Sequence, residues 1–160
     1  MGLGLCADCT ALSVEDNILL MIRPALSGTV IATIKSLTRP AMATVRTTED
    51  TAAKVMVAAG LGVKTQIDRV RDFAQTLGAE LVASRRMVDE GMLPYACQVG
   101  LTGRTVAPPV YIAVGVSGAV HHIVGMQQAG TVIAINPDKD APVFEYADFG
   151  IVADFADIYK

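Results

Sequence analysis

The sequence has few charged residues, few aromatic residues and no tryptophan. Charged residues make up 18% of the 160 residues, aromatic residues make up 5%, and the net charge is −3. Such a chain lacks the basic surface that attracts nucleic acid and the aromatic platforms on which bases stack. We therefore expect no nucleic-acid partner. What remains is an apolar chain, 52% hydrophobic, whose length suits a domain with a sizeable core.

Cysteines are also scarce, and the three that are present are Cys6, Cys9 and Cys97. They are too few for a disulfide framework, and reduced thiols are typical of the cytoplasm, which is the location we expect. Cys6 and Cys9 have CxxC spacing, but no second CxxC, HExxH or carboxylate cluster accompanies them. We therefore expect no bound metal, and buried thiols are favoured over a redox site.

One long stretch of the chain, residues 105–137, has no Asp, Glu, Lys or Arg. Prolines, glycines and polar residues interrupt it, so its longest apolar run is well short of the roughly 20 residues that a membrane span needs. The stretch is interpreted as a buried strand, helix and strand, and no membrane span is expected. The N-terminus lacks the basic region of a signal peptide.

Strands and helices alternate along residues 51–160. Strands are predicted over residues 55–59, 80–83, 110–114, 131–135 and 150–153, and helices over 65–77, 84–90 and 117–128, with Gly78 as the C-cap of the first helix. This alternation predicts an α/β fold with a doubly wound, Rossmann-like parallel sheet. Residues 1–50 contain only short strand-like runs, at 18–22, 29–34 and 41–45, and are interpreted as a strand-rich extension.

Small or polar residues follow three of the predicted strands, at 60–62, 84–86 and 115–118. The start of a helix after such a turn suits a phosphate group, although small residues also simply permit a tight turn. Arg85 either pairs with Asp89 four residues later or holds a positive charge for an anion, and Arg86 is the better candidate for an exposed position. No GxSxG or P-loop motif is present, which favours a cofactor that supplies its own chemistry.

The same segments resemble a known family. Residues 110–122 (VYIAVGVSGAVHH), Gly125 and residues 133–136 (IAIN) are similar to the signature of the electron transfer flavoprotein alpha subunit. Residues 83–85, 88–89, 98–103 (QVGLTG), 141–144 (APVF) and 147–154 (ADFGIVAD) fit that family in order. Residues 7–10, 23–25 and 39–46 (RPAMATVR) resemble the end of its first domain. The resemblance covers essentially the whole chain.

The resemblance implies an FAD-binding electron carrier rather than an enzyme. A beta subunit would complete the particle, acyl-CoA type flavin dehydrogenases would supply electrons, and a quinone oxidoreductase or another acceptor would take them. Arg85 would lie near the isoalloxazine and stabilise its anionic reduced forms, Thr102 would lie near flavin N5, and His122 near the pyrimidine end. The rest of the cofactor site would comprise Ser84, Val99, Gly100, Leu101, Ser117, Gly118, Ala119, Val120, His121, Asn136, Asp154 and Phe155.

The chain departs from the family pattern at several points. Leu61 stands where the family usually has a phosphate-facing arginine, Leu101 stands where it has glutamine, and His121 also replaces a usual glutamine. The large first domain is missing, so residues 1–50 are expected to be its remnant and residues 51–160 the FAD-binding domain. The last helix looks shortened.

Two other functions stay open. The chain could be a non-carrier relative, a structural or interaction module whose site is empty or binds another nucleotide, and Leu61 and Leu101 favour this alternative. It could also be a nucleotide-dependent enzyme on a similar sheet, such as an NAD or thiamine diphosphate domain, because fold alone does not decide function. A strand-rich N-terminal part with unpaired apolar edges also predicts self-association where no partner covers it.

Overall fold

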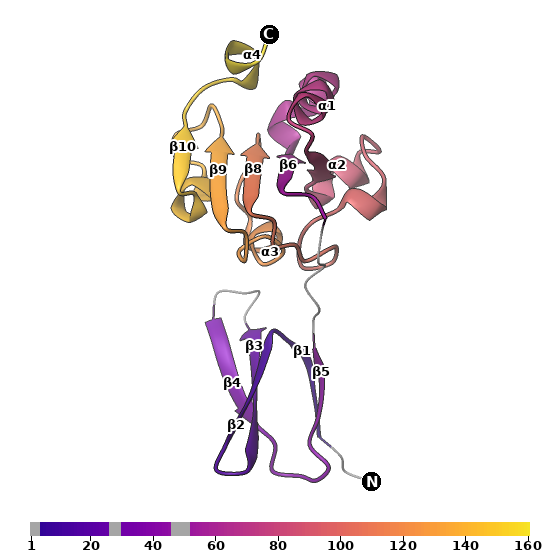
Figure 1. The fold of residues 1–160 in the computed structure, drawn as a ribbon, viewed down its shortest axis with the longest axis vertical. Helices are drawn as coiled ribbons and strands as arrows, with labels where there is room; N and C mark the ends of the chain where they lie inside the picture. The colour runs from indigo at the N-terminus through magenta and orange to yellow at the C-terminus, as the bar shows by residue number, and fades with distance from the viewer. Residues whose placement is uncertain (1–3, 26–29, 46–51) are drawn as a thin grey trace. The chain divides into compact units, whose positions relative to one another are not determined.

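The structure is a computed structural model that describes residues 4–25, 30–45 and 52–160. The chain divides into two compact units, residues 1–47 and 48–160. Figure 1 shows the N-terminal unit built from strands alone and the C-terminal unit built from strands and helices.

A parallel five-stranded sheet forms the centre of the C-terminal unit. It contains β6 (Val55–Ala59), β7 (Glu80–Ala83), β8 (Val110–Val114), β9 (Thr131–Ile135) and β10 (Phe149–Ile151), in the order β10-β9-β8-β6-β7. All four neighbouring pairs are parallel. The chain adds β7 on one side of β6 and then crosses to add β8 on the other side. The expected α/β fold with a parallel sheet is confirmed, and its topological switch point lies between β6 and β8.

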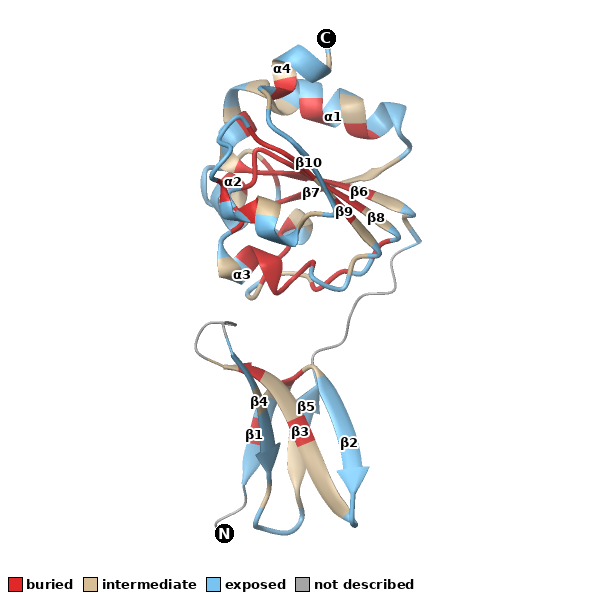
Figure 2. Ribbon diagram, turned by 90° about the vertical axis from the view of Figure 1, so that its left-hand side faces the viewer, coloured by how far each residue is buried: buried red, intermediate tan, exposed pale blue. Residues whose placement is uncertain are grey.

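Helices cover both faces of this sheet because alternate side chains of each strand point to opposite sides. Val57 and Ala59 face one side, which is covered by α1 (Ile67–Thr76), α2 (Arg85–Asp89) and α4 (Phe155–Ile158). Met56 and Ala58 face the other side, which is covered by α3 (Val120–Ile123) and the 3-10 turn η4 (Pro142–Tyr146). Figure 2 shows the inner strands buried and β10 exposed at the edge.

The helices differ from the sequence prediction more than the strands do. The segment predicted as helix 65–77 begins as a 3-10 helix, η2 (Leu61–Gln66), before α1, and Gly78 ends it with φ +60°, as expected of a C-cap. The helix predicted over 117–128 shrinks to α3. Gly118 has φ +87°, and a Cβ there would lie 2.1 Å from the Val143 nitrogen, so the chain cannot enter a helix until Val120. The short η3 (Tyr95–Cys97), η4 and α4 were not predicted.

The N-terminal unit consists of two small sheets. β1 (Leu5–Cys9) pairs in parallel with β5 (Met42–Val45), and β2 (Ala11–Glu15), β3 (Ile18–Ala25) and β4 (Val30–Lys35) form an antiparallel sheet. Asp16 and Asn17 join β2 to β3 with φ values of +48° and +61°, a two-residue hairpin turn. The sequence analysis missed β1 and β2, and Thr29 of its 29–34 strand lies outside the described residues.

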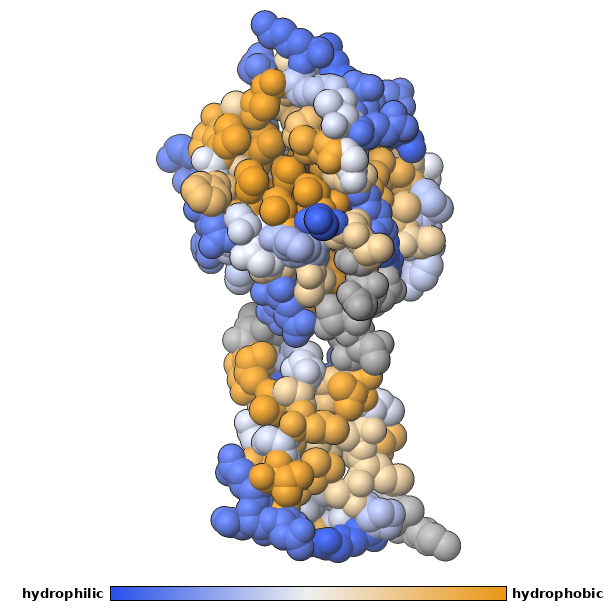
Figure 3. Space-filling model, in the orientation of Figure 1, coloured by the Kyte–Doolittle hydropathy of each residue, from blue (hydrophilic) through white to orange (hydrophobic). Residues whose placement is uncertain are grey.

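This unit buries only a small core, made by Cys6, Cys9 and Met21 with Leu19 and Ala43 beside them. Figure 3 shows apolar side chains gathered on the visible face of the unit. Its strands are therefore only partly covered by one another. The exposed apolar side chains include Leu12, Val14, Val30, Ile31, Ile34, Leu37 and Val45.

We predict that Gly60→Ala destabilises the C-terminal unit by about 1–3 kcal/mol, the usual cost of an overpacked site. A Cβ at Gly60 would lie 2.1 Å from the Gly115 carbonyl oxygen, and both partners are backbone. The measurement is the free energy of unfolding in urea. Gly78→Asn is the matched control, because nothing lies within 4 Å of a Cβ at Gly78 and asparagine tolerates its positive φ. Equal stability of Gly60→Ala and the wild-type chain would contradict the prediction.

Candidate functional site

A pocket of about 510 Å³ lies beyond the carboxyl ends of β6, β7 and β8, where ligands bind in sheets of this topology. Its volume is in the range of small-molecule and cofactor sites. The loops that follow β6, β7, β8 and β9, together with the segment from Gln98 to Thr102, supply its walls. Its lining comprises Leu61, Gly62, Ser84, Arg85, Arg86, Gln98, Val99, Gly100, Leu101, Thr102, Gly115, Val116, Ser117, Ala119, His121, His122, Asn136, Asp138, Ala141 and Pro142.

The floor of the pocket is set by close contact between the loops that follow β6 and β8. The Gly60 N–H donates to the Val114 carbonyl at 2.8 Å, and the Gly62 N–H donates to the Gly115 carbonyl at 3.0 Å. Gly115 has φ +62°, and its N–H donates to Ile135 of β9 at 2.9 Å. These bonds hold the two loops against each other at the switch point, so the pocket opens at a fixed place.

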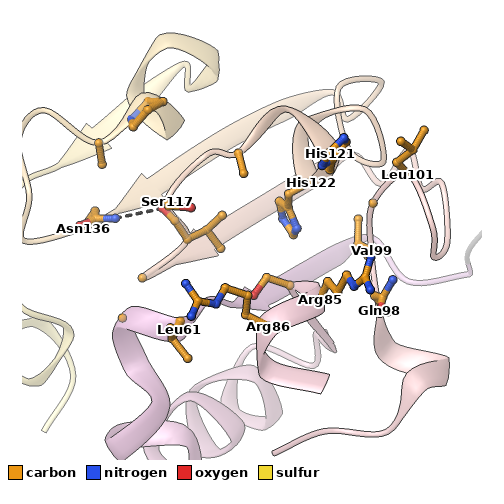
Figure 4. A pocket seen from close by; sticks show the side chains of 18 of the residues that line it. Leu61, Arg85, Arg86, Gln98, Val99, Leu101, Ser117, His121, His122 and Asn136 are labelled. Atoms are coloured by element: carbon orange, nitrogen blue, oxygen red, sulfur yellow. Dashed lines mark hydrogen bonds between the residues drawn. The ribbon is translucent and has the colours of Figure 1, made fainter. Parts of the chain in front are cut away.

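Asn136 fixes the path of the loop after β8. Its side-chain amide donates to the Val116 carbonyl at 2.9 Å, and its Oδ1 accepts from the Asp138 N–H at 2.9 Å (Figure 4). The Val143 N–H donates to the Ser117 carbonyl at 3.2 Å. Ser117 is consequently held at the pocket with its side chain exposed.

A tight turn brings residues 98–102 to the opposite wall. The Val99 N–H donates to Ala83 at the end of β7 at 2.9 Å, and the Leu101 N–H donates to the His121 carbonyl at 2.6 Å. The Gln98 side chain, which is buried, donates to the Thr102 hydroxyl oxygen at 2.9 Å. The Thr102 hydroxyl is thereby oriented, and its own hydrogen remains available for a bond to a ligand.

His122 is buried at the inner end of α3, and its Nε2 lies 3.0 Å from the Tyr111 hydroxyl. Tyr111 is fully buried, and burial raises its pKa, so it stays a protonated phenol. Because this is the only hydrogen bond that the described residues offer the phenol, we infer that its O–H donates to Nε2 and that the imidazole proton sits on Nδ1. Among the described residues, Nδ1 has no hydrogen-bond partner.

His122 is uncharged at neutral pH. Burial lowers its pKa to about 4, and the weaker, opposing effect comes from the backbone of Val99. A neutral His122 therefore offers the pocket a single hydrogen-bond donor and no positive charge. The charge must come from arginine.

Arg85 and Arg86 are the cations among the pocket-lining residues that the structure describes. Figure 4 shows them pointing to different ends of the pocket, Arg85 toward Gln98 and Arg86 toward Leu61. Arg85 also pairs with Asp89, Nε to Oδ2 3.4 Å, and the two side chains are 67% and 60% exposed. The sequence left two interpretations of Arg85 open, an ion pair with Asp89 and a positive charge for an anion. They are compatible, since an exposed ion pair is too weak to hold the side chain away from an anion.

Most of the residues assigned to the site by resemblance do line this pocket, and four do not. Gly118 and Val120 shape the turn into α3 instead of facing the pocket. Asp154 caps α4 by accepting from the Ala156 N–H at 2.9 Å and from the Gln66 amide at 3.0 Å. The Phe155 ring is buried against Phe73 and Tyr159.

The sequence analysis missed several pocket residues. Gly62 and Gly115 were noted as turns and Arg86 as an exposed cation, but Gln98 was not assigned to the site. Gln98 could have been predicted from its apolar neighbours in the sequence, because a glutamine that is buried among apolar residues needs hydrogen-bond partners. Asp138, Ala141 and Pro142 line the pocket from the loop that follows β9, and the length of that loop does not indicate that they do.

The cysteines lie outside this pocket. Cys6 and Cys9 are buried in the N-terminal unit with their sulfur atoms 3.6 Å apart, and burial followed by the contact with Cys6 raises the pKa of Cys9. A buried thiol with a raised pKa, such as that of Cys9, is a poor nucleophile at neutral pH. Within residues 4–25, 30–45 and 52–160, no cluster of three or more His, Cys, Asp or Glu side chains could hold a metal ion.

The residues of the pocket fit a large, partly apolar and anionic ligand. The inner part of the pocket carries a buried imidazole with an unpaired Nδ1, and the pocket lining also carries two guanidinium groups and three hydroxyl groups, those of Ser84, Thr102 and Ser117. An orphaned polar atom of this kind is rare in folded proteins and indicates a missing partner. An acceptor atom on a ligand would satisfy it.

Comparison with known proteins identifies the ligand class. A family model described as the electron transfer flavoprotein domain matches residues 1–81, and one described as the electron transfer flavoprotein FAD-binding domain matches residues 51–127. The chain belongs to the electron transfer flavoprotein family. The resemblance seen in the sequence is confirmed, and so is the expectation of FAD as the cofactor of the C-terminal domain.

Individual relatives agree with the family models. The electron transfer flavoprotein subunit alpha of Thermoanaerobacterium thermosaccharolyticum is 36% identical over 94% of this chain and 60% of its own length. Protein FixB of Rhizobium meliloti is 36% identical over 94% of this chain and 56% of its own length. The alpha subunit of Pseudomonas aeruginosa is 47% identical over 68% of this chain and 36% of its own. The chain thus spans about 60% of the length of such relatives.

The charge-poor stretch, residues 105–137, lies inside the C-terminal unit. None of the helices in the described residues is long and apolar enough to cross a membrane. Residues 105–137 form β8, α3 and β9 with their connecting turns, which is the strand, helix and strand that the sequence predicted.

We predict that protonation of His122 destabilises the fold in acid. Its pKa is about 4 in the folded chain and about 6.5 when unfolded, so between these pH values the unfolded chain binds the extra proton. The stability contributed by neutral His122 is complete above pH 6.5 and is lost as pH falls toward 4, on the order of 3 kcal/mol in all. Urea unfolding at several pH values measures this loss. The loss should be smaller in His122→Gln and unchanged in His121→Ala, whose side chain is exposed; parallel pH profiles of wild type and His122→Gln would refute the prediction.

Proposed function

We propose that this chain is the FAD-binding subunit of an electron carrier. The observation that carries the proposal is the pocket of a matched FAD-binding domain in which a buried, uncharged His122 leaves Nδ1 unpaired and Arg85 stands at the rim. FAD, when bound, supplies the redox chemistry, because it accepts and releases electrons without a catalytic side chain.

The side chains of the pocket would divide the work by their charge and hydrogen-bonding capacity. Arg85 would place a permanent positive charge beside the isoalloxazine and favour its reduced, anionic state. His122 would donate through Nδ1 to an acceptor at the pyrimidine end. Thr102, oriented by Gln98, would donate near flavin N5. Ser84 and Ser117 would bind polar groups along the cofactor, and Val99, Gly100 and Leu101 would pack against it.

The partners follow from the same family assignment. We propose that an electron transfer flavoprotein beta subunit binds this chain, that flavin dehydrogenases of the acyl-CoA type donate electrons, and that a quinone oxidoreductase or another acceptor receives them. Three free cysteines fit a reducing compartment, the cytoplasm. The exposed apolar side chains of the N-terminal unit support contact with a partner chain or a second copy.

One observation favours a second candidate, a non-carrier relative with an altered site. Leu61 and Leu101 present apolar side chains to the pocket where the family pattern has polar ones. A non-carrier would keep the fold as an interaction module and would not bind FAD.

The visible spectrum of the purified chain, before and after incubation with FAD, separates the two. A carrier shows flavin absorbance, quenching of FAD fluorescence with a saturable Kd, and reversible reduction. The carrier proposal would be abandoned if no FAD were taken up alone or with a beta subunit present.

Replacement of Arg85 tests the assigned chemistry. We expect Arg85→Ala to lower the midpoint potential of bound FAD by on the order of tens of millivolts, because the reduced anion loses a nearby positive charge. Arg85→Lys should recover part of the shift. Arg71→Ala, an exposed substitution on α1 outside the pocket, is the matched control. An unchanged potential in Arg85→Ala would remove this arginine from the proposed role.

A further inference from the structure

The second arginine of the pair, Arg86, has no role in the proposed function so far. It is exposed, it lines the pocket, and it points to the end where Leu61 lies, away from Arg85 (Figure 4). Consecutive residues of a helix lie about 100° apart around its axis, so the two guanidinium groups reach different parts of one ligand. The pocket therefore has two separate positive ends.

Of the two pocket arginines, Arg85 and Arg86, only Arg86 lacks an ion-pair partner among the described residues. Glu90, four residues later on the same helical face, is the partner that Arg86 would ordinarily take. Lys64 takes it instead, with Nζ 2.6 Å from the carboxylate, and the pKa of Glu90 is lowered first by that contact and less by Arg86. Within the described part of the chain Arg86 makes no ion pair, whereas Arg85 pairs with Asp89.

The surroundings of Arg86 select an anionic ligand group. Figure 4 shows Leu61 and Ser117 at the end of the pocket toward which Arg86 points. Gly62 and Gly115, which meet at the contact between the β6 and β8 loops, also line the pocket. The side chain of Leu61 supplies no charge and no hydrogen-bond donor there. A guanidinium group left unpaired beside small residues and a hydroxyl suits a phosphate oxygen, which accepts two parallel N–H bonds.

We infer that Arg86 binds the diphosphate of FAD and supplies, from α2, the positive charge that Leu61 cannot supply from the β6 loop. The inference rests on the proposed binding of FAD. It assigns two roles to two adjacent arginines, Arg85 to the isoalloxazine and Arg86 to the diphosphate. The ion pair of Lys64 with Glu90 supports the second role, because it keeps Glu90 from neutralising Arg86.

Binding of FAD, ADP and riboflavin to the full chain tests this inference, since only the first two contain a diphosphate. Arg86→Ala should raise the Kd for FAD and ADP about tenfold, the usual value of one charge-assisted contact, and leave the Kd for riboflavin within about twofold. The FAD affinity of the variant should also depend less on salt between 50 and 300 mM. Circular dichroism and the melting temperature show whether the variant is folded.

Moving the positive charge from position 86 to position 61 tests the inference more sharply than removing it. Leu61→Arg in the Arg86→Ala background should restore most of the FAD affinity, because it returns a cation to the same end of the pocket. Lys64→Ala, outside the pocket, should weaken FAD binding by freeing Glu90 to pair with Arg86, and Lys64→Ala with Glu90→Ala should reverse that loss. Arg71→Ala is the charge-matched control and should change no Kd.

The outcomes separate this inference from the proposed function. If wild type binds FAD and Arg86→Ala binds it equally well, Arg86 does not meet the diphosphate. If Arg86→Ala weakens riboflavin as much as FAD, the side chain acts on the isoalloxazine or on the fold. If wild type binds none of the three ligands, the proposed function itself fails, and this inference falls with it.

Discussion

The contact between the β6 and β8 loops is the constraint on which the rest of the site depends. Gly60 lies so close to the Gly115 backbone that no side chain fits between them, Gly62 leaves little more room, and the bond from Gly62 to the Gly115 carbonyl fixes the separation. This closeness is possible only where the sheet changes direction, with β7 on one side of β6 and β8 on the other. The pocket opens beside that contact, and the segment from Gln98 to Thr102, held by bonds to Ala83 and His121, closes its opposite wall.

The strands of the C-terminal unit could be predicted from the sequence because their information is local. Val57 and Ile112 belong to short apolar runs bounded by small residues. A continuous apolar run of this length indicates a strand buried on both faces, even when the neighbouring strands are not known. The helix predicted over 117–128 failed for the opposite reason. Gly118 is held at φ +87° by its approach to Val143, and Gly125 packs on Gly100. Both contacts join segments distant in the sequence, so helical periodicity could not reveal them.

In the candidate site, too, the features that depend on contacts between distant segments could not be predicted from the sequence. Resemblance supplied Arg85, Thr102 and His122, but it could not supply the state of His122, which depends on a hydroxyl eleven residues earlier on β8. Tyr111 looks like one more apolar strand residue in the sequence. In the fold its phenol occupies Nε2, and burial keeps the ring neutral, so the imidazole becomes a fixed hydrogen-bond donor instead of a titrating base. A core residue thus decides what a pocket residue can do.

The positive charge of the pocket shows how a departure from a family pattern can be offset at another position. By the resemblance, a cation would stand on the β6 loop where this chain has Leu61. That loop and the start of α2 border the same space, since β6 and β7 are neighbouring parallel strands. A guanidinium group on a long side chain reaches from one border to the other. On this inference, two conditions must hold at this end of the pocket: a positive charge lies near the ligand, and no carboxylate neutralises that charge. The ion pair of Lys64 with Glu90 meets the second condition, because it engages the Glu90 carboxylate. The position of the arginine in the sequence is then free to change, while the place of its charge in the pocket is not.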